Sequence, residues 1–91
     1  MIMKKYAIKD RITNVMTGET REYFTGKDDY IHDDLYFVEG YTRKSFAEKK
    51  IKNEISFLSH MNGGKEIDDR RCIESKIWFH TFEIIEIDCG C

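Results

Sequence analysis

The sequence predicts an α+β fold in which a small, mostly antiparallel sheet of three to four strands carries one amphipathic helix on one face. Three segments lead to this prediction. Residues 4–12 alternate between apolar and polar side chains, residues 42–61 repeat apolar side chains at helical spacing, and residues 77–88 form an apolar, strand-like run. In chain order they indicate a ββαβ-like layout in a single domain over residues 1–91.

The first two strands are expected to form a β-hairpin. Tyr6, Ile8 and Ile12 share one side of the alternating segment, which is typical of a strand with one buried face. A turn around Gly18 follows, and residues 20–25 return to strand composition. The connection is longer than the two-residue loop of a tight hairpin.

The segments on either side of the helix are expected to be less regular. Residues 27–34 are acidic, and Asp side chains compete for backbone hydrogen bonds, so a loop is predicted there. Residues 35–38 are expected to be a short strand that stops at Gly40. Residues 65–76 are charged and are expected to form a loop or an irregular hairpin arm.

The helix is expected to have Thr42 or Ser45 as its N-cap and to stop at Asn62 and the two glycines that follow. At about 100° per residue, four apolar side chains form a stripe that suits packing on a sheet. These are Ala47, Ile51, Ile55 and Leu58.

A second apolar stripe lies beside the first and consists of Phe46, Phe57 and Met61. Lys50 and Glu54 project between the two stripes at i,i+4 spacing, which allows an ion pair. Either the second stripe wraps round the edge of the sheet, or it meets a partner or a second copy of the chain. In the last case these three residues are the face of a homodimer.

In the closing strand, residues 77–88, the apolar side chains switch from one face of the strand to the other near Ile84 and Ile85. Its earlier apolar residues mostly share one parity, and its later ones share the other. Two structures explain such a change: a β-bulge at this point, or a central strand that is partly covered on both faces.

Composition and charge exclude several classes of function. The 91 residues carry a formal net charge of −2, so global charge gives no reason to bind nucleic acid or an anionic membrane. No run approaches the roughly 18–20 consecutive apolar residues of a membrane span. The basic start also lacks the apolar run of a signal peptide. We therefore expect a cytoplasmic protein with reduced cysteines and no membrane contact.

No motif indicates a metal, a cofactor or catalysis. Cys72, His80, Cys89 and Cys91 supply a legitimate zinc set, but the one-residue gap at the chain end makes a poor chelate. The acidic loop lacks the alternating ligands and central glycine of a calcium loop. None of the three histidines sits in a catalytic motif, and His80 is expected to be a partly buried packing residue. No cofactor, no metal and no enzymatic activity are therefore expected.

The acidic loop is the first candidate for binding a partner. Residues 27–39 hold five acidic residues against one basic residue, a local charge of −4. A dense acidic patch can occupy a basic groove on a protein that handles nucleic acid, and a solvated surface without a partner is the alternative. The candidate binding residues are Asp28, Asp29, Tyr30, Asp33, Asp34, Tyr36 and Tyr41.

The helix offers a second candidate surface, of opposite charge. Residues 42–54 hold five basic residues against two acidic ones, a local charge of +3. Basic residues near the N-terminal end of a helix oppose its dipole, so helix stability does not explain them. They form either a surface that contacts nucleic-acid phosphates or an ordinary solvated helix face. The candidate contacts are Arg43, Lys44, Lys49 and Lys52.

The order of these patterns resembles small single-domain proteins of phages and mobile elements of low-GC Gram-positive bacteria. The likeness rests on a Lys-Lys-Tyr strand, a Thr-Gly turn, an aromatic-glycine stop, a lysine-rich helix and a closing strand, at residues 4–10, 17–19, 37–41, 44–51 and 82–87. Residues 65–76 and the cysteine-containing tail are not part of the pattern. The resemblance implies a ββαβ-type layout and service in host takeover or in evasion of defence systems, as anti-CRISPR-like inhibitors provide.

The leading hypothesis is a non-enzymatic protein that binds and inhibits a bacterial host protein through the acidic loop. The first alternative is a small nucleic-acid-binding module that uses the basic side chains of the helix. The second alternative is a structural homodimer.

Overall fold

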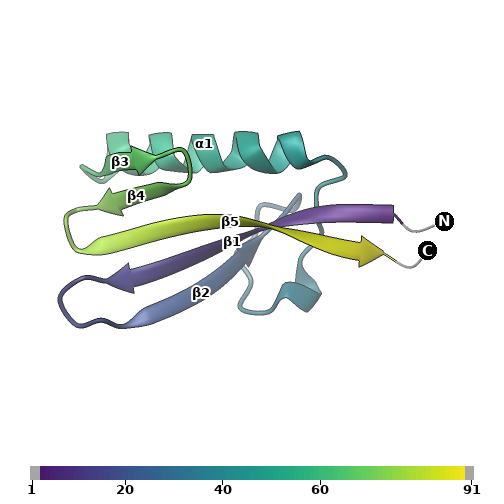
Figure 1. Cartoon of the computed structure of the whole chain (residues 1–91), viewed down its shortest axis with the longest axis horizontal. Coiled ribbons are helices and arrows are strands. Elements are labelled where there is room, and N and C mark those ends of the chain that lie inside the picture. The colour runs from purple at the N-terminus through teal and green to yellow at the C-terminus, as the bar shows by residue number, and fades with distance from the viewer. Residues whose placement is uncertain (1–2, 90–91) are drawn as a thin grey trace.

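The computed structural model describes residues 3–89 and shows one long helix packed on a five-stranded antiparallel sheet (Figure 1). The strand order across the sheet is β2-β1-β5-β4-β3. The elements are β1 (Met3–Asn14), β2 (Thr20–Thr25), a 3-10 turn η1 (Leu35–Phe37), α1 (Lys44–Met61), β3 (Lys65–Asp68), β4 (Arg71–Glu74) and β5 (Trp78–Cys89). The predicted α+β class is confirmed, whereas the expected three to four strands are too few.

The predicted hairpin of β1 and β2 is confirmed. Its register runs from Ile8 opposite Thr25 to Thr13 opposite Thr20. Gly18 lies in the turn with φ of 75°, a backbone conformation that glycine adopts without steric cost. The hairpin therefore follows from the period-two pattern and from the placement of one glycine.

β5 is the middle strand of the sheet, and it contains no bulge. Its pairing with β1 is unbroken from Met3 opposite Cys89 to Asn14 opposite Trp78. The prediction of a β-bulge at Ile84 and Ile85 is therefore wrong. The other predicted alternative, a central strand with apolar residues on both faces, is confirmed.

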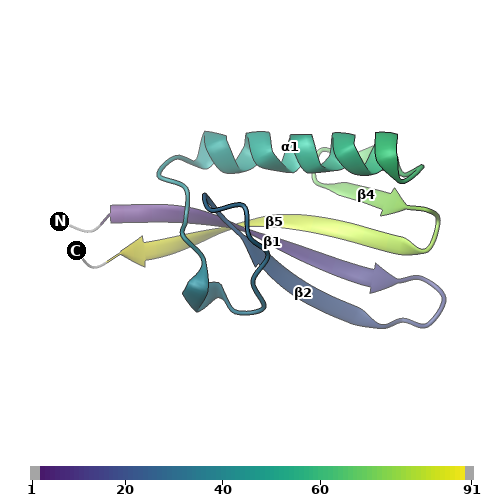
Figure 2. The same cartoon turned by 180° about the vertical axis from the view of Figure 1, so that it is seen from behind.

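The helix packs through the predicted stripe. Ala47, Ile51, Ile55 and Leu58 are the buried residues of α1, and they form one core with Ile8, Cys72 and Phe82 of the sheet. In both views the helix lies along β4 and β3, while the hairpin of β1 and β2 extends away from it (Figures 1 and 2). Among the described residues, no helix is long and apolar enough to cross a membrane.

The N-cap of the helix differs from the prediction. Arg43 occupies that position with extended backbone and makes no side-chain capping hydrogen bond, so neither Thr42 nor Ser45 is the cap. The predicted stop is confirmed, because Asn62 is the C-cap and Gly63 follows with φ of 65°.

One further segment also differs. Residues 35–38 contain a 3-10 turn and not a strand, because the Asp34 side chain accepts a hydrogen bond from the Tyr36 backbone N–H at 2.9 Å and starts the turn. For residues 65–76 the irregular hairpin, one of the two predicted alternatives, is confirmed: β3 pairs with β4, with a register shift between Glu66 and Asp68. This hairpin accounts for the larger number of strands.

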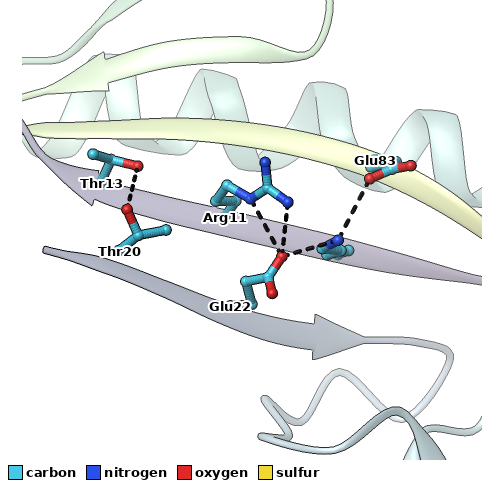
Figure 3. A network of polar contacts seen from close by, with 6 residues as sticks. Arg11, Thr13, Thr20, Glu22 and Glu83 are labelled. Atoms are coloured by element: carbon cyan, nitrogen blue, oxygen red, sulfur yellow. Dashed lines mark hydrogen bonds and ion pairs between the residues drawn. The ribbon is translucent and has the colours of Figure 1, made fainter. Parts of the chain in front are cut away.

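The sheet face without the helix carries a polar network (Figure 3). The Glu22 carboxylate lies 2.9 Å from Lys9 Nζ and 3.1 Å from Arg11 Nη2, and Lys9 also reaches Glu83 at 3.8 Å. Exposed ion pairs of this kind contribute about 0–1 kcal/mol each. The network thus keeps this face compatible with water and adds little to stability.

Candidate functional site

The segment between β2 and α1, residues 26–43, lies on the same side of the sheet as the helix (Figure 2). Its ends are fixed to the sheet by backbone pairs of Phe24 with His32 and of Tyr6 with Tyr41. Within it, the Lys27 N–H donates to the Glu39 carbonyl oxygen at 2.6 Å. The acidic loop predicted from the sequence is therefore held in place at several points.

A glycine makes this close contact between the two ends of the loop possible. A Cβ at Gly26 would overlap the backbone oxygen of Glu39 and a methyl group of Val38. Only hydrogen fits at this position, so the loop depends on the glycine for its closed shape.

Three of the four candidate aspartates make contacts within the chain. Asp28 Oδ2 lies 2.9 Å from His32 Nε2, and this hydrogen bond is the main cause that lowers the pKa of Asp28. Asp29 lies 3.2 Å from Lys50 Nζ on the helix. Asp34 starts the 3-10 turn. Asp33 is exposed and has no ion pair with the described residues.

The aromatic candidates divide into exposed and packed side chains. Tyr30 is 71% exposed and Tyr36 is 86% exposed. Tyr41 instead packs against the core, and burial, with Asp29 next, raises the pKa of its hydroxyl. Tyr41 therefore belongs to the scaffold of the loop and not to its outer surface.

Phe37 is a surface residue that the sequence reasoning missed. It is 66% exposed and meets the Tyr36 ring edge to face, with centroids 5.4 Å apart. The neighbouring Asp33 and Asp34 are exposed as well. We call Asp33, Asp34, Tyr36 and Phe37 the loop patch. Their adjacency in the sequence is the signal that could have identified Phe37.

The basic candidates on the helix are exposed but do not share one face. Arg43 precedes the helix, and at about 100° per residue Lys44 and Lys49 point roughly 140° apart. Lys49 and Lys52 lie on the outer side, away from the buried stripe. None of the four forms an ion pair with the rest of the described chain.

The second helix stripe is exposed along its whole length. Phe46, Phe57 and Met61 are 48%, 55% and 69% exposed, so they do not wrap round the edge of the sheet. The predicted pair of Lys50 and Glu54 is confirmed, with 3.2 Å between Nζ and Oε1. Burial alone would lower the pKa of Lys50, but the hydrogen bonds and charges of Glu54 and Asp29 outweigh burial and raise the pKa.

The structure also assembles a polar cluster that the sequence reasoning missed. His80 of β5 is only 5% exposed and lies between two carboxylates on the helix side of the sheet. Its Nδ1 is 3.2 Å from both carboxylate oxygens of Asp10, and its Nε2 is 2.8 Å from Oε2 of Glu74. Burial alone would lower the pKa of His80, but the two carboxylates outweigh burial and raise it.

This arrangement favours an imidazolium that donates from both ring nitrogens. Such a histidine has no free nitrogen with which to accept a proton, so in this state it links β1, β4 and β5 and does not act as a base. The signal in the sequence is Asp10, which shares the apolar parity of Ile8 and Ile12. A carboxylate on a buried strand face requires a partner.

Cys72 lies beside His80 in the cross-strand register and is fully buried. Burial, followed by the charges of Asp10, Glu74 and Glu66, raises the pKa of its thiol to about 11. Cys91 lies outside the described residues, as does the side chain of Cys89. Within residues 3–89, no three His, Cys, Asp or Glu side chains are placed to hold a metal ion.

A groove runs beside the helix over β1 and β2. It consists of two hollows of about 310 and 290 Å³ that share Ile12 and Tyr23. The first is also bounded by Asp29 and Ile31 of the loop, and the second by Trp78 of β5. We call this feature the helix-side groove. The loop and the groove are therefore parts of one continuous surface.

Comparisons with known proteins identify no relative of this chain. No protein-family model matches the chain, and neither a curated protein nor a solved structure matches it. The geometry described above is therefore the basis for any statement about function.

Proposed function

We propose that this protein is a non-enzymatic accessory protein of a phage or mobile element that acts in the bacterial cytoplasm. It binds and inhibits a host protein, in the manner of an anti-CRISPR protein, and its target is a defence factor that handles nucleic acid. The loop patch is the observation that carries the proposal.

The chemistry of the loop patch suits a protein partner. Tyr36 and Phe37 are 86% and 66% exposed, so a partner can bury them. Burial of an aromatic side chain is among the strongest contributions to binding. Loops normally expose small polar residues, and adjacent aromatic residues at a loop tip are typical of binding surfaces. The fixed ends of the loop reduce the entropy that binding would cost.

The charge of the loop indicates the class of partner. Residues 27–39 carry a local charge of −4, whereas the whole chain carries −2. A basic surface is electrostatically complementary to this loop. Proteins that handle nucleic acid present such surfaces to phosphates, so an acidic loop flanked by aromatic side chains can compete for them.

The test begins with affinity capture from bacterial lysate and mass spectrometry, followed by binding measurements with the purified partner. Replacing Asp28, Asp29, Asp33 and Asp34 by Asn should weaken binding at least tenfold and flatten its dependence on salt. The control replaces Glu66, Asp69, Glu83 and Glu86 by their amides. Unchanged binding of the loop variant, or equal loss in both variants, would refute the loop as the binding site.

A nucleic-acid-binding module remains the alternative proposal, and one observation favours it. Arg43, Lys44, Lys49 and Lys52 have no ion-pair partner in the described part of the chain, so their charges are available to phosphates. Titration of labelled single-stranded and duplex DNA and RNA against salt tests it. Micromolar binding with a steep salt dependence supports this alternative, and no binding at low salt removes it.

A further inference from the structure

We propose that the sheet face opposite the helix binds single-stranded nucleic acid, with Arg11 and Arg71 in contact with phosphates and a base stacked on Phe79. This inference goes beyond the proposed function, because it assigns a second surface and a different kind of partner. It also differs from the nucleic-acid-binding alternative above, which uses the basic side chains of the helix.

The strand register defines this surface. Residues directly opposite each other on paired strands point to the same face of a sheet. The pairs therefore form rows on the side that Figure 3 shows, with the helix behind the sheet. One row holds Thr20, Thr13, Phe79, Ile73 and Lys65, and the row beside it holds Glu22, Arg11, Thr81, Arg71 and Asp68. We call the side with these rows the open sheet face.

The open sheet face is basic although the chain as a whole is acidic. The register places five basic and three acidic side chains on it, which leaves a charge of +2, whereas the whole chain carries −2. The side chains are Lys5, Lys9, Arg11, Lys65 and Arg71 against Glu22, Asp68 and Glu83. The rest of the molecule therefore carries −4, and an anionic partner is complementary to this face.

The ion pairs on the face do not cancel this excess. A single carboxylate, that of Glu22, lies near both Lys9 at 2.9 Å and Arg11 at 3.1 Å. Within residues 3–89, neither Lys5 nor Lys65 forms an ion pair. Two positive charges thus remain for a partner.

Arg11 and Arg71 are placed to hold phosphates. They lie on either side of Thr81, two strand spacings or about 10 Å apart along the row. Arg11 donates from Nε and Nη2 to Glu22, and its third nitrogen points away from that carboxylate (Figure 3). Arg71 donates from Nε to Asp68. A guanidinium has five N–H groups, so both arginines are oriented by a carboxylate and keep donors for phosphate oxygens.

Phe79 supplies the stacking surface beside these arginines. It lies on the middle strand β5, is partly exposed, and has the guanidinium carbon of Arg71 6.0 Å from its ring centre. Nucleobases stack on aromatic rings and on guanidinium planes. Thr13 and Thr81, which adjoin Phe79 on the same face, add hydroxyl groups for sugar or base edges.

This combination indicates a single strand as the occupant. An acidic protein surface would match the charge, but it would not use a flat aromatic ring between two arginines. Bases in a duplex are stacked on one another and do not present their faces, whereas the bases of a single strand are free to stack on a protein. We therefore expect a preference for single strands of at least tenfold over duplex.

The test is fluorescence anisotropy with a labelled oligothymidine of about 12 nucleotides, a length that spans a typical single-strand site. The wild type should bind with a micromolar dissociation constant at about 50 mM salt. Arg11→Gln with Arg71→Gln should raise that constant at least tenfold and lower the slope of log K against log salt by roughly 1.4, as two lost phosphate contacts imply. Phe79→Thr should weaken binding about as much and leave the slope unchanged.

The matched control removes the same charge from the helix by Lys49→Gln with Lys52→Gln, and its binding should stay within about twofold of wild type. Circular dichroism checks that each variant is folded. In NMR spectra of the wild type, the oligonucleotide should shift the amide signals of β1, β4 and β5 more than those of α1. No wild-type binding at low salt, equal affinity for duplex, equal loss in both charge variants, or loss in the helix variant alone would each overturn the proposal.

Discussion

Replacing His80 by Phe should destabilise the protein strongly and should remove part of its pH dependence. The substitution keeps an aromatic ring in the core but takes away the charge and both N–H groups. The side chains of Asp10 and Glu74 are only 21% and 24% exposed, so both carboxylates are then mostly buried against an apolar ring that cannot donate a hydrogen bond. His60, which is exposed on the helix, provides the matched control through His60→Phe.

The magnitude follows from the contacts that are lost. Removing one partner of a fully buried ion pair costs about 3–5 kcal/mol, because the other charge remains buried. Both carboxylates retain some contact with water, and the phenyl ring adds apolar burial, so we expect about 2–4 kcal/mol. For a domain of this size that corresponds to a fall in Tm of roughly 10–25 °C.

The sign of the pH dependence follows from the raised pKa of His80. The folded pKa lies above the ordinary value of 6.5, so the stabilisation by this residue is complete below pH 6.5 and is lost as pH rises through the folded pKa. The thiol of Cys72 has a pKa of about 11 against an ordinary 9.0, so it lowers stability only above pH 9.0. Above pH 6.5 and below pH 9.0, where Cys72 begins to contribute, the decline in stability should therefore come mainly from His80.

Urea unfolding at several pH values, followed by circular dichroism and Trp78 fluorescence, measures both effects. The wild type and His60→Phe should lose stability across this window, whereas His80→Phe should start lower and vary less with pH. A direct NMR titration of the His80 ring should give a pKa above 6.5. Equal stability of His80→Phe and wild type, or equal pH dependence, would refute the proposed role of the cluster.

Three further predictions concern the core, the loop and the buried thiol. Ile55→Ala should lower the free energy of unfolding by about 2–4 kcal/mol, because Ile55 is 3% exposed, while Lys49→Ala should change it by less than about 0.5 kcal/mol; urea unfolding checks both. Gly26→Ala should cost about 2–3 kcal/mol, since its Cβ would overlap a backbone oxygen. Gly18→Ala, with φ of 75° but open space around it, should cost only about 1 kcal/mol, and equal losses in thermal melts would contradict the argument. Cys72 should react with a thiol reagent at about pH 8 at least roughly a hundredfold more slowly in the native protein than in urea, as its pKa of about 11 implies; peptide mapping that finds equal rates would disprove this.

The sequence predicted the elements whose pattern is strong. The period-two alternation around Ile8 and the four-residue core stripe of the helix led to the correct hairpin and the correct packing face. The short apolar run at residues 35–38 was ambiguous, because its 3-10 turn depends on one hydrogen bond from the Asp34 side chain. The sequence left residues 65–76 open between a loop and an irregular hairpin, because this segment contains few apolar residues to indicate strands.

The polar cluster shows a limit of another kind. Asp10 and His80 are 70 positions apart, and only the pairing of β1 with β5 brings them together. Likewise, Tyr36 and Tyr41 look equivalent in the sequence, but Tyr36 is exposed to solvent whereas Tyr41 packs against the core. Such distinctions depend on strand register and on tertiary packing, and neither is encoded in local patterns.

Quantitative affinity capture tests most directly whether the loop patch binds a host protein. Three baits are compared: the wild type, Tyr36→Ala with Phe37→Ala, and a control with Val15→Ala and Met16→Ala. The control residues are 50% and 81% exposed at the opposite end of the hairpin. If the loop patch is the binding site, one bacterial protein is retained by the wild type and the control and is lost from the loop variant. Equal retention of that protein by all three baits would show that the loop patch does not bind it.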